Sequence, residues 1–245
     1  MKTLVTFIAL VPKMAQDDYV GFTFFVGCMA MIAASAFFFL SMNNFDRKWK
    51  TSILVSGLIT FIAAVHYWYM RDYWVSNAES PTFFRYVDWI LTVPLMCVEF
   101  YLILRVAGAK KSLMWRLIIA SLIMLVTGYL GEAVYRENAQ IWGLASGIAY
   151  FYIVYEIWLG SAKKLAVKAG GAVLSAHKTL SWFVLVGWAI YPLGYMAGTP
   201  GWYDFLNGSL SMDVIYNIGD AINKIGFGLV IYSLAVNASE KSTAS

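Results

Sequence analysis

Charged residues are scarce in this chain, at 13% of 245 residues, whereas 60% are hydrophobic. A soluble domain rarely has such a composition, but a polytopic membrane protein does. Solenoid-type repeats and low-complexity tracts are absent too, which excludes a repeat protein. The two cysteines, Cys28 and Cys97, fall within apolar runs. They are therefore expected to be small buried residues, with neither a disulfide nor a metal site.

Long apolar runs fill nearly all of the chain. A helix needs about 20 mostly apolar residues to cross a bilayer. Seven stretches meet this requirement: about 19–42, 51–72, 81–105, 113–134, 139–161, 176–198 and 208–237. The sequence therefore predicts an all-α, seven-helix membrane bundle that forms a single domain over 1–245. Residues 1–18 have two interpretations, a short secretory signal or a retained extracellular segment, and the poor cleavage site favours retention.

The positions of the basic residues predict the orientation. Most of the 18 Lys and Arg residues lie in the first, third and fifth loops or in the C-terminal tail. Because Lys and Arg accumulate on the cytoplasmic side, we expect the N-terminus outside and the C-terminus in the cytoplasm. The basic loops then need no nucleic-acid partner, since topology and anionic lipid account for them.

Three ionisable residues interrupt the third span, "FRYVDWILTVPLMCVEF": Arg85, Asp88 and Glu99. Such groups are costly in a bilayer and indicate a functional site. Asp88 and Glu99 are eleven residues apart. On a helix that is about 16 Å, and the angle nearly repeats, so both carboxyls face the same way, with Thr92 between them. In the predicted orientation Asp88 lies in the outer half of the membrane and Glu99 in the inner half.

The seventh span contains a lysine within "YNIGDAINKIGFGLVIY". Lys224 and Asp220 are four residues apart and share one face of the helix. A neutral lysine amine condenses with carbonyls to a Schiff base, and a protonated Schiff base needs a counter-ion, for which Asp220 and Asp88 are candidates. A structural Lys–Asp pair that joins helices explains this segment equally well on its own.

Four segments together resemble the microbial rhodopsins, and within them the proteorhodopsins: "VHYWYMRDYW", "RYVDWILTVPLMCVEFYLIL", "GWAIYPLGY" and "GDAINKIGFGL". The resemblance covers essentially the entire chain. It implies a light-driven outward proton pump, a transporter and not an enzyme, in a prokaryotic plasma membrane. All-trans retinal would be bound to Lys224 as a protonated Schiff base. The family also suggests rings of five or six protomers surrounded by lipid, with no soluble substrate.

The resemblance implies a role for each polar residue. Asp88 would be the primary counter-ion and first proton acceptor, and Asp220 the second counter-ion. Glu99 would be the cytoplasmic-side proton donor, in surroundings dry enough to keep its proton until the Schiff base has lost its own. Arg85 would lie just outside the counter-ions and help to gate release, and Thr92 would form a hydrogen bond near Asp88.

The same resemblance assigns residues to the retinal pocket. Trp89, Trp188 and Tyr191 would line the retinal, although each ring alone is ordinary packing. His66 matches the family histidine that pairs with the counter-ion, but a core histidine bonded to a backbone carbonyl explains it too. Met96 lies where the family tunes colour, and an apolar, polarizable side chain there predicts green absorption.

Gly143 falls where many proteorhodopsins have a bulky aromatic residue beside the retinal ring. A glycine there resembles the rhodopsins that bind a carotenoid antenna through an opening to lipid, so a hydroxylated carotenoid is a candidate second cofactor. Close helix packing is the alternative. Glu132 belongs either to a proton exit region or, the favoured interpretation, to a hydrated helix end, and Glu156 is expected to cap the inner end of the fifth span.

Two other functions compete with the pump. A sensory rhodopsin that signals through a transducer shares the fold, the retinal and the counter-ion, but often lacks the carboxylic donor that Glu99 supplies here. A non-retinal seven-helix receptor or transporter is disfavoured by Lys224 and its two acids. The half-helix breaks typical of secondary transporters are also missing from the sequence pattern.

Overall fold

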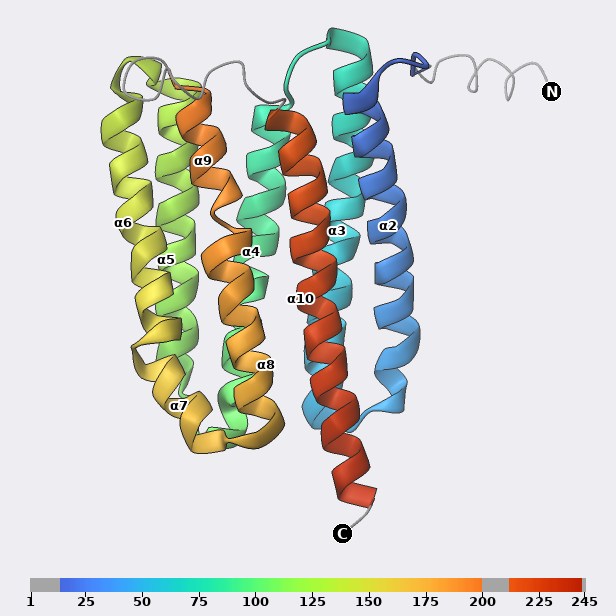
Figure 1. The fold of residues 1–245 in the computed structure, drawn as a ribbon, viewed down its shortest axis with the longest axis vertical. Helices are drawn as coiled ribbons and strands as arrows, with labels where there is room; N and C mark the ends of the chain where they lie inside the picture. The colour runs from blue at the N-terminus through green and yellow to red at the C-terminus, as the bar shows by residue number, and fades with distance from the viewer. Residues whose placement is uncertain (1–13, 200–211, 244–245) are drawn as a thin grey trace, which may run out of the picture.

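The computed structural model describes residues 14–199 and 212–243. Within them, seven helical spans are long and apolar enough to cross a membrane: Tyr19–Asn44, Arg47–Asn77, Thr82–Ala107, Lys111–Val134, Arg136–Ala169, Gly171–Ala197 and Met212–Ser239. The predicted seven-helix bundle is confirmed. The first span begins and the last one ends at opposite ends of the bundle (Figure 1).

The long helices are joined by short turns, most of them helical themselves. The helices are α2 (Tyr19–Ser41), α3 (Arg47–Asn77), α4 (Thr82–Leu104), α5 (Lys111–Tyr129), α6 (Ala139–Trp158), α7 (Ser161–Ala169), α8 (Gly171–Trp182), α9 (Ile190–Ala197) and α10 (Met212–Thr243). The short turns are η1 (Met42–Asn44), η2 (Arg105–Ala107), η3 (Leu130–Val134), η4 (Arg136–Asn138) and η5 (Phe183–Gly187).

The spans close into a ring. Each helix from α2 to α6 packs against the next one along the chain, and α10 packs against α2, α3 and α8. Figure 1 shows α10 running the length of the bundle between these neighbours. Large apolar side chains such as Leu40, Ile141 and Phe151 remain exposed on the outside. This suits a lipid environment, where apolar side chains need no further cover.

Local signals set the helix ends. The Asp18 carboxylate accepts a hydrogen bond from the Gly21 N–H at 2.8 Å, as an N-cap residue does. The same oxygen accepts from Trp74 Nε1 at 3.0 Å, so the cap also ties α2 to α3. Helix α3 ends at Ala78, whose left-handed φ of 54° directs its N–H to the Trp74 carbonyl. Pro81, which has no N–H to satisfy, then precedes α4.

Two π-helical turns interrupt the spans, η3 in the fourth and η5 in the sixth. A π turn leaves carbonyls free to bond elsewhere. In η5 the carbonyls of Val184 and Leu185 each accept from the Tyr150 hydroxyl at 3.0 Å. The Gly187 carbonyl accepts from Asn223 Nδ2 at 2.9 Å. These bonds attach the sixth span to α6 and α10, and they fix the turn that directly precedes Trp188 and Tyr191, two of the predicted pocket aromatics.

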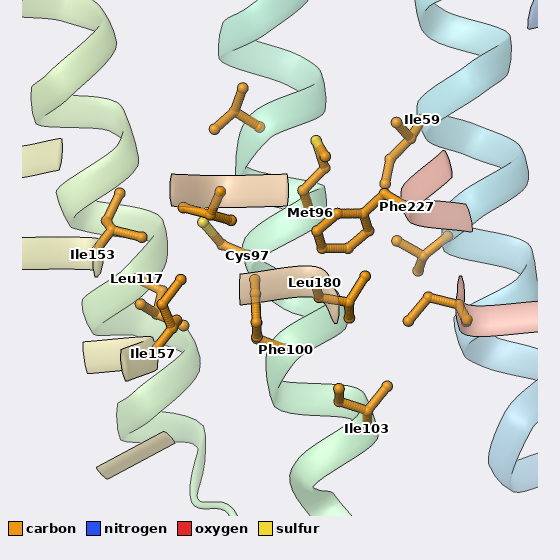
Figure 2. Close-up of a cluster of buried hydrophobic side chains, with 14 of the residues drawn as sticks. Ile59, Met96, Cys97, Phe100, Ile103, Leu117, Ile153, Ile157, Leu180 and Phe227 are labelled. Atoms are coloured by element: carbon orange, nitrogen blue, oxygen red, sulfur yellow. The ribbon is translucent and has the colours of Figure 1, made fainter. Parts of the chain in front are cut away.

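An apolar core fills the bundle around the second half of α4. Figure 2 shows Met96 of α4 beside the ring of Phe227 from α10. The rings of Phe100 and Phe227 meet edge to face, with centroids 5.7 Å apart. Cys28 and Cys97 are both buried, as predicted, and the Cys28 thiol donates to the Ala64 carbonyl at 3.4 Å.

The structure corrects the predicted boundaries near the fifth loop. Residues 162–169 were expected in a loop but belong to α7, and the sixth span begins at Gly171 and not at about 176. Alanine, leucine and lysine are strong helix formers, which explains why this segment is helical despite its charges. Residues 1–13 of the predicted N-terminal segment, and 208–211 of the predicted seventh span, lie outside the described residues.

Candidate functional site

The Lys224 amine lies between two carboxylates. Its Nζ is 2.6 Å from Asp88 Oδ2 and 2.5 Å from Asp220 Oδ2. All three side chains are at most 1% exposed. Asp220 is one helical turn before Lys224 on α10, whereas Asp88 reaches the amine from α4. The predicted lysine and both predicted counter-ions are therefore brought together.

The charges in this cluster do not cancel. One ammonium between two carboxylates leaves one net negative charge when all three groups are ionised. Oxygen Oδ1 of Asp220 is satisfied by the Tyr191 hydroxyl at 2.8 Å. Oxygen Oδ1 of Asp88, in contrast, has no hydrogen-bond partner among the described residues. An unpaired buried carboxylate oxygen is costly, so Asp88 is the less completely satisfied carboxylate of the pair.

His66 lies near Asp88 without bonding it. Its Nδ1 is 3.9 Å from Asp88 Oδ1 but 2.9 Å from the Ile62 carbonyl. A carbonyl only accepts, so Nδ1 carries the proton and donates it to Ile62. The hydrogen bond to Ile62 fits a core histidine bonded to a backbone carbonyl. The distance to Asp88, longer than a hydrogen bond, leaves room for the alternative, an electrostatic pairing with the counter-ion.

Thr92 acts on the backbone of α4. Its hydroxyl donates to the carbonyl of Asp88 at 2.9 Å, one turn back along the helix. It therefore lies beside the predicted acceptor, as expected, but bonds the main chain and not the carboxylate. Back-bonding of this kind is common for threonine within helices.

Arg85 turns away from the counter-ions. Its Nη2 is 2.6 Å from Asp213 Oδ1, and its Nη1 donates to Asn217 Oδ1 at 3.2 Å. The guanidinium is buried and lies 4.9 Å from the ring centroid of Tyr216, in cation–π range. The predicted position just outside Asp88 is compatible with this arrangement, but the partner of Arg85 was not predicted.

A cavity of about 570 Å³ lies beside the ion cluster. Its walls include Trp89, Trp188 and Tyr191, the three aromatic residues expected to line a retinal. Trp89 and Tyr191 meet edge to face with centroids 4.7 Å apart, and the Tyr191 hydroxyl connects this wall to Asp220. An apolar aromatic cavity next to a buried amine fits a long conjugated aldehyde. Met96 is buried as well, but it packs with Phe227 and is not part of the cavity wall.

Glu99 lies inside the bundle, in the second half of α4. It is 0% exposed, and its Oε1 accepts from the Ser56 hydroxyl of α3 at 2.9 Å. Its Oε2 and the hydroxyl of Ser52 have no hydrogen-bond partner among the described residues. No cation pairs with Glu99 in the described part of the chain. A carboxylate anion buried without a neighbouring cation is costly, so this environment favours the protonated form of Glu99.

Gly143 lines the same cavity together with Gly147. A Cβ at Gly143 would be 2.7 Å from the ring of Tyr195, so the glycine allows a close approach of α9 to α6. A Cβ at Gly147 would meet nothing within 4 Å. Exposed residues at the rim, Leu144 and Ile148, belong to the outer surface of α6. Space beside Gly143 and close packing against it are therefore both present.

Two further acids have definite partners. Glu132, in η3, accepts from the Tyr86 hydroxyl at 2.7 Å, and Tyr86 also lines the cavity. Glu156 accepts from the N–H and hydroxyl of Ser161 at 3.1 and 2.7 Å and pairs with Arg116. Glu156 therefore lies in the last turn of α6, at the expected end of this helix, and the backbone that it caps is the start of α7.

Sequence reasoning missed two groups. Asp213 and Asn217, which hold Arg85, precede Lys224 by eleven and seven residues on α10. Helical periodicity places both on the face of Asp220 and Lys224, so the signal was present. Ser56, the partner of Glu99, could not be singled out from the sequence, because serine occurs in membrane helices both for close packing and for hydrogen bonds.

Known proteins were compared with the chain. The family model for bacteriorhodopsin-like proteins matches residues 18–238. A green-light absorbing proteorhodopsin from Gamma-proteobacterium EBAC31A08 is 42% identical over 244 residues, covering 98% of this chain and 95% of the relative. The crystal structure of a blue light-absorbing proteorhodopsin from Med12 has a TM-score of 0.75 and 41% identity, covering 90% of this chain and 100% of that one.

A second similar structure belongs to a protein with two chromophores. Xanthorhodopsin, described as a light-driven ion pump with dual chromophore, has a TM-score of 0.79 and 28% identity, covering 92% of this chain and 95% of that one.

Proposed function

Since this chain belongs to the family of bacteriorhodopsin-like proteins, we propose that it is a light-driven outward proton pump with all-trans retinal bound to Lys224 as a protonated Schiff base. The observation that carries the proposal is the buried Lys224 amine between Asp88 and Asp220, beside an aromatic cavity. A merely structural ion pair would need no cavity.

Retinal, when bound, supplies a light-driven isomerisation that alters how firmly the nitrogen holds its proton. The residues of the chain do the rest. Lys224 Nζ holds the proton against Asp88 Oδ2 at 2.6 Å, so the first transfer needs no large movement. Accepting the proton removes a buried charge from Asp88, while Tyr191 continues to stabilise the anion of Asp220. Trp89 and Trp188 line the cavity that would hold the retinal.

Glu99 returns a proton to Lys224 from the opposite side of the membrane. Its complete burial without an ion pair among the described residues favours the neutral acid until the nitrogen becomes a free base. Direction then follows from acceptance at Asp88 and return from Glu99. Moving one charge against 100 mV costs about 2.3 kcal/mol, which is small beside the energy of a visible photon. Glu99 also favours a pump over a sensory rhodopsin, which often lacks this donor.

Illumination of cells tests the pump. Cells that express the chain with added retinal, in unbuffered medium, should acidify the medium in light, and a protonophore should abolish the signal. Lys224→Ala should give neither colour nor acidification, whereas Lys178→Ala, at an exposed site, should behave as the parent. Borohydride trapping followed by mass spectrometry should locate retinal on Lys224. An adduct elsewhere, or none, would exclude the proposal.

We propose green absorption, from the apolar Met96. Overall identity does not decide the colour, because the green and blue relatives are 42% and 41% identical to the chain. Met96 packs against Phe227, in surroundings that a glutamine would make polar. A spectrum of the purified pigment decides the point, and Met96→Gln should move the maximum toward blue.

We further propose that the protein binds a carotenoid antenna as a second cofactor. Support comes from the cavity beside Gly143 and Gly147, and from the likeness to xanthorhodopsin, titled as having a dual chromophore. Hydroxylated carotenoids added to the pigment should transfer excitation energy to retinal, and Gly143→Phe should abolish the transfer. No transfer in either protein would remove the antenna and leave the pump intact.

The chain is a multi-pass protein of the prokaryotic plasma membrane, in accord with its seven spans and its bacterial relatives. Its orientation, with the N-terminus outside and the C-terminus in the cytoplasm, rests on the basic residues of the odd loops. A ring of five or six protomers is part of the proposal as well. Labelling of a single introduced cysteine from outside the cell tests the orientation. Native mass spectrometry tests the number of protomers.

A further inference from the structure

Arg85 is the buried cation next to the counter-ion cluster, yet it points elsewhere. In the described part of the chain its only ion pair is with Asp213, at 2.6 Å. Neither Asp88 nor Asp220 lies within ion-pair distance of the guanidinium. A net negative cluster should attract a nearby cation, so something must hold Arg85 in its present position.

Asp213 is itself held in place. Its Oδ1 accepts from the Ser80 hydroxyl at 2.9 Å as well as from Arg85. Asn217, the second acceptor of Arg85, is tied to α2 because its Nδ2 donates to Thr23 Oγ1 at 2.9 Å. These contacts join α2, α4 and α10 in one network. Its geometry fixes the guanidinium on the side of Asp213.

We propose that Asp213 is a positioning residue, which holds Arg85 away from the counter-ion carboxylates and thereby sets how strongly Asp88 binds a proton. The proposal rests on the proposed function, because the cluster becomes a proton site only with retinal on Lys224. Asp213 touches neither Lys224 nor Asp88, so its action must pass through Arg85 or through its own charge.

Both routes predict the same direction. Neutralising Asp213 removes a negative charge from the neighbourhood and frees Arg85 to turn toward Asp88 and Asp220. Each change favours the ionised form of Asp88. The other charged or titratable groups that face this network are Glu132 from η3, His66 and Tyr67 from α3, Tyr191 from α9, and Tyr216 and Lys224 from α10. The charge of Asp213 also acts on Glu132 and Tyr216, whereas the substitution breaks no hydrogen bond of the other groups.

The test is the pH titration of the colour change that accompanies protonation of Asp88. In Asp213→Asn the midpoint should fall by about one pH unit relative to the parent. Asp213→Glu keeps the charge and should restore the midpoint. Asp72→Asn is the matched control, since it neutralises an acid in a 2.7 Å pair with Arg71, remote from Lys224, and should leave the midpoint unchanged. If the asparagine variant fails to bind retinal, Asp213→Ser removes the same charge with a smaller side chain, and the same fall is required.

A double-mutant cycle separates positioning from a direct charge effect. In an Arg85→Gln background, Asp213→Asn should no longer move the midpoint. An equal fall in that background, or an unchanged or raised midpoint in the single variant, would overturn the proposal. Failure of the proposed function is distinguishable, because then the parent would form no pigment with retinal and no titration would exist.

Discussion

Buried carboxylates lie toward both ends of α4, in opposite surroundings. In the Arg85 half, defined by Arg85, Asp88, Asp213, Asp220 and Lys224, acids and bases contact one another at 2.5–2.6 Å. In the Glu99 half, defined by Glu99, Ser52 and Ser56, one fully buried carboxyl has one hydroxyl partner and no ion pair among the described residues.

The difference supports the proposal that two carboxyls on a single helix have opposite tasks. Ion pairs and hydrogen bonds stabilise the ionised form in the Arg85 half, which suits a proton acceptor. Burial without an ion pair disfavours charge in the Glu99 half, which suits a proton donor. Four predictions test this contrast, in order of decreasing effect.

Asp88→Asn should remove the proposed proton acceptor and, with it, one of the two ion pairs of Lys224 in the Arg85 half. Light-driven acidification should fall by at least about 100-fold, because no group replaces the carboxylate 2.6 Å from Lys224. The absorption maximum should move to the red, since a negative charge beside the protonated nitrogen is lost. Asp17→Asn, exposed before α2, should pump as the parent does. Normal pumping by Asp88→Asn would contradict its assignment as the acceptor.

Glu99→Gln should leave the first proton transfer intact and slow the second. Flash photolysis should show the deprotonated pigment forming at the parental rate and decaying about 100-fold more slowly, which is the usual scale of general acid catalysis. Azide, a small diffusible acid, should restore the decay. Glu137→Gln, at an exposed position, is the control. An unaltered decay would mean that Glu99 is not the donor and that the contrast between the halves has no role in pumping.

Ser56→Ala should make the surroundings of Glu99 less polar by removing its hydrogen bond from the Ser56 hydroxyl. The free energy of unfolding should fall by about 1 kcal/mol, the usual worth of such a bond. The carbonyl stretch of protonated Glu99 should move to higher wavenumber in infrared difference spectra, because Ser56 no longer bonds to Oε1. Ser35→Ala, which deletes a hydroxyl bonded to a backbone carbonyl nearby, should leave that stretch unchanged. A stretch that stays in place in Ser56→Ala would argue against the contact.

His66→Asn should have the smallest effect, on the Arg85 half. The midpoint of the colour titration should rise by about half a pH unit, since an imidazole near Asp88 favours the carboxylate. The 3.9 Å separation from Asp88 and the direct bond to Ile62 keep the expected shift small. If the titration does not move, His66 is a core histidine bonded to a backbone carbonyl, which is its alternative interpretation.

Contacts along one helix were the predictable part of the site. Asp220 and Lys224 follow from a spacing of four residues, and the bond of Thr92 to the Asp88 backbone follows from the same spacing. The partner of Arg85 was not predicted, although Asp213 lies on the predicted face of α10, because the sequence does not reveal which way the guanidinium turns. Glu156 lies at the predicted end of α6, but its capping of α7 was not predicted, because the sequence pattern did not reveal that a helix begins after Gly160.

The sequence by itself determined the seven spans and the polar faces of α4 and α10, because helical periodicity and the cost of charge in lipid act within single segments. Only the tertiary structure decided that Asp88 reaches Lys224, that Arg85 turns to Asp213, and that Ser56 bonds Glu99. The rotation and depth of each helix relative to its neighbours depend on side-chain packing, and the π turn at η5 shifts the face that the sixth span presents.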